Sequence, residues 1–165
     1  MSAVFVFVRA VTYATLFIGF VLVFLPARIL SRYGVVSPPS VGIAQLLGIV
    51  TATAGAALAV WCILAFALIG RGTPAPFDPP RRLVVRGPYR HVRNPMYLGA
   101  AAALAGAALY YGSMVLALYA AGFLLVTHSF VVWYEEPTLR AMFGADYERY
   151  CSGVRRWRPR LTVGG

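Results

Sequence analysis

Long uninterrupted runs of apolar residues dominate the chain and separate it into hydrophobic segments with polar breaks. The runs cover residues 4–25, 41–69, 96–111 and 114–134. A helix needs about 20 apolar residues to cross the hydrocarbon core of a bilayer, so the run at 96–111 is short and the other three are long enough. The pattern predicts an all-α, polytopic integral membrane protein with about four transmembrane helices.

The breaks between the runs predict the loops and the helix ends. Asn94 is a good N-cap and Pro95 is preferred at the first helical position, so a helix is expected to begin there. Gly112 and Ser113 predict a turn, which makes residues 95–134 a helical hairpin. Residues 26–40 are expected to be a loop. The five prolines of residues 70–93 predict an extended connection.

The tail, residues 135–165, is predicted to be amphipathic and to lie on the membrane surface. Its first short helix would have three apolar residues on one face, Leu139, Met142 and Phe143. Gly144 is expected to end that helix, and Asp146 to cap a second one.

Small residues recur inside two of the apolar runs at near-helical spacing. They are Gly42, Gly48 and Gly55 in one run, and Gly99, Ala103 and Gly106 in the other. Small residues allow helix backbones to approach closely in lipid, so a packing role is expected for both sets.

Composition and charge refine the membrane assignment. Hydrophobic residues make up 60% of the chain, charged residues 12%, and the net charge is +10. Every basic residue is an arginine, and most lie between or after the apolar runs, as a membrane surface selects; nucleic-acid binding is not expected. The absence of lysine and the abundance of alanine suggest a GC-rich bacterial genome. The membrane would then be a bacterial inner membrane.

The arginines also predict the orientation. Residues 70–93 and the tail carry six arginines each, whereas residues 26–40 carry two. The positive-inside rule therefore places the connection, the tail and both termini in the cytoplasm.

Two groups of polar residues are candidates for chemistry, because polar side chains are costly in a membrane. The first group is a basic cluster just before the helix that begins at Pro95, and it consists of Arg86, Arg90, His91 and Arg93. The free N–H groups at the start of a helix favour anions at the same place. The second group is the acidic pair at the cytoplasmic end of the last span, with a histidine seven residues earlier on the same predicted face: Glu135, Glu136 and His128.

Together the two groups predict a cytoplasm-facing pocket of mixed charge that suits a zwitterionic ligand with a cationic centre. The alternatives are that the arginines only orient the protein, that the glutamates only start the tail helix, and that the histidine only packs. The sequence contains no metal-ligand set, nucleophilic triad or phosphate loop.

Two sequence blocks resemble the isoprenylcysteine carboxyl methyltransferases and the related phospholipid N-methyltransferases. The first is Gly87-Pro88-Tyr89-Arg90 followed by Arg93-Asn94-Pro95-Met96-Tyr97-Leu98-Gly99. The second is Glu135-Glu136-x-x-Leu139, then Phe143-Gly144-x-x-Tyr147-x-x-Tyr150, Val154 and Arg156-Trp157-x-Pro159. The blocks occur in the family's order and are separated by the hairpin.

The resemblance implies a single membrane domain over residues 1–165, with two N-terminal spans in residues 1–70 and a catalytic region in residues 71–165. It implies a membrane methyltransferase that binds S-adenosylmethionine from the cytoplasm and a lipophilic acceptor from the bilayer, among membrane lipids. With the polar groups above, it gives these candidate cofactor-binding residues: Arg90, Arg93, Asn94, Tyr97, Leu98, Gly99, His128, Glu135 and Glu136.

The expected catalytic roles depend on the acceptor. A carboxylate is already a nucleophile, and Arg155 or Arg156 would orient it. An amine must lose a proton, which Glu135 could accept. A thiol acceptor also stays open.

The chain departs from the family at one position, where Asn94 replaces a frequent histidine; asparagine cannot be a cation, which hints at a different substrate. One rival is an NADPH-dependent reductase like the sterol reductases, although Glu135 and Glu136 would repel a cofactor phosphate. The other rival is a non-enzymatic membrane relative.

Overall fold

The structure, a computed structural model, describes residues 8, 12, 15–70 and 82–159. Every regular element in these residues is a helix, which confirms the predicted all-α fold. Three of the described helices are long and apolar enough to cross a membrane: Thr15–Arg32, Ile43–Ala65 and Met114–Phe143. This assignment rests on length and composition, and it confirms an integral membrane protein.

The first membrane helix continues past the point where the sequence predicted its end. It contains the π-helical turn η1 (Gly19–Phe24) and the α-helix α2 (Leu25–Arg32). The sequence predicted a loop over residues 26–40; that prediction was wrong for residues 26–32, which are helical, whereas residues 33–40 are not helical. Pro26 lies two residues after the end of the π-helical turn, where regular α-helical hydrogen bonding is already interrupted, so its ring and its missing N–H are accommodated. The predicted start of this span lies largely outside the described residues.

The second predicted span is confirmed to within a few residues. It consists of α3 (Ile43–Ala65) and the π-helical turn η2 (Phe66–Gly70). Most of the first half of the following connection lies outside the described residues. Residues 82–94 are not helical except for the single 3₁₀ turn η3 (Gly87–Arg90). The predicted extended connection therefore holds for most of its described part.

The predicted hairpin is confirmed. It consists of α4 (Pro95–Tyr111) and α5 (Met114–Phe130), and Gly112 makes the turn with a φ of 58°. Asn94 is the N-cap residue of α4, but its side chain does not cap the helix. The 17 residues of α4 span about 26 Å at 1.5 Å each, somewhat less than the hydrocarbon core. That α4 is a fourth transmembrane helix stays a prediction.

The last span and the first tail helix form one continuous helix of 30 residues. The π-helical turn η4 (Val131–Glu135) joins α5 to α6 (Glu136–Phe143). The sequence predicted that the last span ends at Tyr134, and the helix itself continues beyond that residue to Phe143. Pro137 follows the π-helical turn, as Pro26 follows η1, so the helix again passes a proline without ending.

The second tail helix is α7 (Ala145–Gly153). Gly144 ends α6 as predicted, with a φ of 48°, and it is also the N-cap residue of α7. The prediction that Asp146 caps this helix was therefore wrong. Asp146 lies in the first turn, where it pairs with Arg149 at 3.4 Å.

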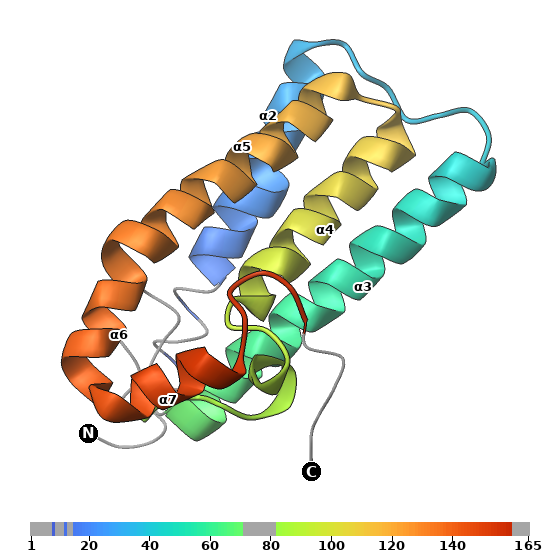
Figure 1. The fold of residues 1–165 in the computed structure, drawn as a ribbon. Coiled ribbons are helices and arrows are strands. Elements are labelled where there is room, and N and C mark those ends of the chain that lie inside the picture. The colour runs from blue at the N-terminus through green and yellow to red at the C-terminus, as the bar shows by residue number, and fades with distance from the viewer. Residues whose placement is uncertain (1–7, 9–11, 13–14, 71–81, 160–165) are drawn as a thin grey trace.

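The long helices lie side by side as a bundle, with α4 between α3 and α5 (Figure 1). The loop after α2 and the turn at Gly112 lie at one end of the bundle. Residues 82–94, α6 and α7 lie at the opposite end. The two predicted groups of polar residues therefore come to the same end.

Helices α3 and α4 pack more extensively than any other pair, because glycines remove side chains from their contact. A Cβ on Gly55 would lie 2.5 Å from the carbonyl oxygen of Gly99 and 2.6 Å from the amide nitrogen of Ala103. Gly48 lies against Gly106 in the same way. The predicted packing role is confirmed for these glycines. Gly42 lies outside the contact and donates its N–H to the side chain of Gln45.

We expect Gly55→Ala to lower the free energy of unfolding by about 1–3 kcal/mol, because the new methyl group forces two backbones apart. Gly122→Ala on α5 is the matched control, since a Cβ there meets nothing within 4 Å. The measurement is thermal unfolding of both variants in the same detergent. Equal midpoints for the two variants would contradict the close contact between α3 and α4.

Candidate functional site

A pocket lies at the end of the bundle that holds residues 82–94, α6 and α7. It contains about 420 Å³ of space between the atoms, part of which is continuous with open solvent. Four separate segments of the chain contribute to its wall: Phe66, Leu83, Val84, Tyr89, Arg93, Asn94, Glu135, Glu136, Leu139, Tyr147 and Tyr150.

On one side of the pocket, Glu136 is held between two arginines. Arg156 donates to both carboxylate oxygens, from Nε at 2.7 Å and from Nη2 at 2.9 Å. Arg93 lies 3.2 Å from the same carboxylate through Nη1. Glu136 is only 3% exposed, and a carboxylate buried to that extent needs such paired charges. The hydrogen bonds to Glu136 also raise the pKa of the Arg156 guanidinium.

Residues 154–159, which we call the C-terminal strap, bring Arg156 to this place. The backbone N–H of Arg93 donates to the carbonyl oxygen of Arg155 at 2.9 Å. The side-chain amide of Asn94 donates to the carbonyl oxygen of Arg156 at 3.2 Å. Trp157 donates through Nε1 to Nδ1 of His128 on α5 at 3.0 Å. The strap therefore ties the start of α4 to α5.

Glu135 has a different environment from its neighbour. Its carboxylate accepts a hydrogen bond from the hydroxyl of Tyr97 on α4, at 3.0 Å. Glu135 is the last residue of the π-helical turn η4, and Glu136 is the first residue of α6. A π-helical turn changes the phase of the residues that follow it, and such turns often occur at functional sites. Successive residues of a helix also point about 100° apart, so the two adjacent carboxylates meet different partners.

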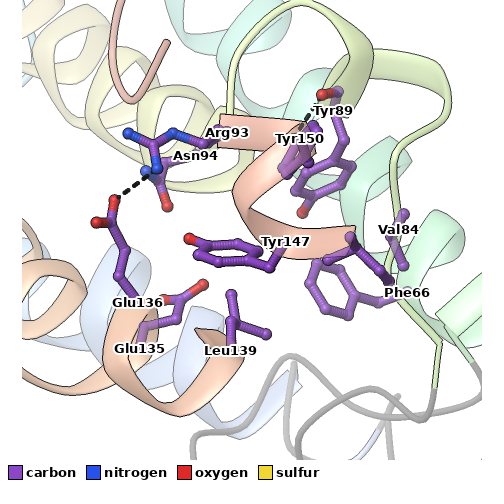
Figure 2. Close-up of a pocket in the computed structure, with 11 residues that line it drawn as sticks. Phe66, Val84, Tyr89, Arg93, Asn94, Glu135, Glu136, Leu139, Tyr147 and Tyr150 are labelled. Atoms are coloured by element: carbon purple, nitrogen blue, oxygen red, sulfur yellow. Dashed lines mark hydrogen bonds and ion pairs between the residues drawn. The ribbon is translucent and has the colours of Figure 1, made fainter. Parts of the chain in front are cut away.

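Aromatic rings form most of the remaining wall (Figure 2). Tyr147, which is 2% exposed, lies between the ion pair of Arg93 with Glu136 and the apolar side of the pocket. The hydroxyl of Tyr150 donates to the carbonyl oxygen of Tyr89 at 2.6 Å. The rings of Phe66 and Tyr89 meet edge to face, with centroids 5.3 Å apart.

Two polar atoms of the pocket residues are buried without a hydrogen-bond partner. They are Nε of Arg93 and the hydroxyl oxygen of Tyr89, and within the described part of the chain no other buried side-chain nitrogen or oxygen is in this state. The thiol of Cys62 lies beside the Tyr89 hydroxyl, and a thiol is a weak hydrogen-bonding group. Buried polar groups are nearly always paired, so two unpaired donors in one pocket indicate a place for a ligand.

The structure brings some of the predicted site residues to the pocket and leaves others away from it. Arg93, Asn94, Glu135 and Glu136 line it, and Tyr97 reaches it through Glu135. The side chains of Arg90, His128 and Arg155 are exposed, and Leu98 is half-buried; none of them lines the pocket. Gly99 packs against Gly55, and the guanidinium of Arg156 is bound to Glu136.

The sequence did not assign a role to most residues of the aromatic wall. Tyr89, Tyr147 and Tyr150 belong to the two blocks that carry the family resemblance, and that was the available signal. Phe66 and Val84 lie outside both blocks, and no local pattern distinguishes them from other apolar residues. Only the packing of residues 82–94 against the end of α3 brings these two side chains together.

Helices long and apolar enough to cross a membrane, with a pocket that holds buried charged side chains at one end, define an integral membrane protein with a candidate enzyme site. Residues 43–146 match the phospholipid methyltransferase family, which is well over half of the chain. The chain therefore belongs to this family, which confirms the resemblance predicted from the sequence. No curated protein and no solved structure matches the chain. Membership implies a membrane methyltransferase that acts on lipid. The matched residues include Arg93, Glu135 and Glu136, whereas the C-terminal strap lies beyond them.

Proposed function

We propose that the protein transfers a methyl group from S-adenosylmethionine to a lipophilic acceptor, and that the pocket beside Arg93 and Glu135 binds the cofactor. The observation that carries the proposal is the pair of unpaired buried donors, on Arg93 and Tyr89, in a pocket that also holds the carboxylate of Glu135. Methyltransferases of this family generally use this cofactor, which supports the assignment.

The side chains of the pocket fit the parts of this cofactor. The unpartnered Nε of Arg93 suits a carboxylate of the ligand, and Glu135 suits an ammonium group. Glu136 is already paired with two arginines, so Glu135 is the acidic residue that we assign to the ligand. The aromatic rings of Tyr147 and Phe66 suit a planar base and a cationic sulfur. When bound, the cofactor would supply a methyl group on a sulfonium centre, ready for in-line displacement.

The contribution of the protein would be mainly to position the reacting groups. Proximity and orientation are large rate factors in such transfers. Arg156 and Glu136 hold Arg93 in place, and the strap fixes the start of α4 beside them. These contacts would give the cofactor one orientation relative to the acceptor.

An amine acceptor fits the pocket better than a carboxylate. Arg155 and Arg156, the candidates for orienting a carboxylate, do not line the pocket, whereas Glu135 does. Glu135 could accept the proton that an amine must lose. We propose that the acceptor enters from the bilayer, and that the pocket faces the cytoplasm of a bacterial inner membrane, as the arginine distribution suggests.

Calorimetric titration of the protein in nanodiscs with S-adenosylmethionine, and separately with NADPH, tests the proposal. We expect binding of S-adenosylmethionine alone. A transfer assay with labelled methyl groups would then compare phosphatidylethanolamine, a prenylated cysteine and a small hydrophobic acceptor. Binding of NADPH alone would overturn the proposal in favour of a reductase. Failure to bind either cofactor, also with acceptor lipid present, would favour a non-enzymatic relative.

A further inference from the structure

Tyr89 has a combination of properties that its structural surroundings do not explain. It lies in the 3₁₀ turn η3 and is only 5% exposed. Its backbone carbonyl oxygen is paired with Tyr150, but its hydroxyl has no nitrogen or oxygen partner among the described residues. The thiol of Cys62 lies beside this hydroxyl, but a thiol is a weak hydrogen-bonding group, so the hydroxyl keeps the capacity to bond to a stronger acceptor.

The hydroxyl of Tyr89 points into the pocket. Figure 2 shows the ring entering the group of pocket residues, with its oxygen directed toward Tyr147 and Phe66. Burial is the largest of the effects that raise the pKa of this hydroxyl well above its ordinary value, and the nearby thiol and carboxylate raise it further. The hydroxyl therefore keeps its proton at physiological pH and can act as a hydrogen-bond donor.

The surroundings of this donor suit a planar heteroaromatic ring. Phe66, Val84 and Tyr150 line the same part of the pocket wall as Tyr89, whereas Arg93 and Glu136 lie on the other side of Tyr147. Aromatic side chains stack on nucleobases, whereas apolar side chains cannot form the ion pairs or hydrogen bonds that a charged group needs. A nucleobase carries ring nitrogens that accept hydrogen bonds. Such a nitrogen acceptor is the partner that the Tyr89 hydroxyl lacks.

We propose that Tyr89 is a specificity residue whose hydroxyl donates a hydrogen bond to a ring nitrogen of the cofactor's adenine. Phe66 and Val84 would lie beside the base. This inference rests on the proposed function and assigns the two sides of the pocket. The side with Arg93 and Glu135 binds the amino-acid part of the ligand, and the side with Tyr89 binds the base.

The test measures affinities of S-adenosylhomocysteine and its 1-deaza, 3-deaza and 7-deaza forms, each of which lacks one ring nitrogen. Titrations use the full-length protein in nanodiscs, as wild type and as Tyr89→Phe. We expect Tyr89→Phe to weaken binding of the parent compound by about 3- to 10-fold, the usual effect of one neutral hydrogen bond. One deaza form should bind equally to both proteins, because it lacks the atom that accepts the bond.

The matched control is Tyr119→Phe, because the hydroxyl of Tyr119 donates to the carbonyl oxygen of Val21 at 2.8 Å, away from the pocket. This variant should leave all four affinities unchanged. Unchanged affinities in Tyr89→Phe, or an equal loss of affinity for the parent and every deaza form, would overturn the role proposed for Tyr89. Either result would leave the proposed function of the protein standing. Failure of the wild-type protein to bind the parent compound would overturn the proposed function, and this inference with it.

Discussion

Glu135→Gln is expected to bind S-adenosylmethionine about 10- to 150-fold more weakly while the protein stays folded. The substitution keeps the shape of the side chain and a partner for the Tyr97 hydroxyl, which donates to Glu135 at 3.0 Å. It removes the negative charge that we assign to the ammonium group of the ligand. Hydrogen bonds to charged groups contribute about 1.5–3 kcal/mol, which gives this range.

Calorimetry in nanodiscs measures the affinity, and thermal unfolding of the same samples checks the fold. Glu148→Gln is the matched control, because Glu148 pairs with Arg140 on the surface and both side chains are about half exposed. It should change neither quantity. Undiminished cofactor affinity in Glu135→Gln would remove Glu135 from the binding site.

Glu136→Gln, one residue further on, is expected to act on stability first. The carboxylate of Glu136 is buried between Arg93 and Arg156, and its neutralisation leaves two guanidinium groups facing each other. Removal of one partner from a buried ion pair costs about 3–5 kcal/mol. We expect a loss near 3 kcal/mol, because the Arg156 side chain is a third exposed and solvent weakens its share.

The check is the free energy of unfolding in detergent, measured for Glu136→Gln beside Arg140→Gln. Arg140 belongs to an exposed ion pair, so its substitution should cost less than about 1 kcal/mol. If the two variants were equally stable, the ion pairs of Glu136 would not hold the pocket together. Loss of cofactor binding in Glu136→Gln is expected only as a consequence of a displaced Arg93.

The contrast between these two variants separates the role of Glu135 from that of Glu136, whereas the sequence predicted the same role for both. In the sequence, Glu135 and Glu136 are a single acidic pair, and both were expected to bind the cofactor. Adjacent residues of a helix point about 100° apart, so the two carboxylates meet different partners, and the π-helical turn η4 ends at the first of them, Glu135. The same turn explains why His128 does not join them: the expectation of a shared face assumed regular α-helical periodicity from 128 to 135.

The sequence by itself determined the all-helical membrane fold, the hairpin, the packing role of the glycines in α3 and α4, and the two polar groups at one end of the bundle. These features follow from local patterns: apolar runs, helix-start and turn residues, and the spacing of small residues. Only the tertiary structure decided which carboxylate faces the pocket, where the C-terminal strap lies, and which aromatic side chains line the wall. The reason is that the pocket forms through contacts between segments distant in the sequence, such as those that bring together Phe66, Tyr89, Glu136 and Arg156. In addition, two π-helical turns carry helices past Pro26 and Pro137, where local rules predict that a helix ends.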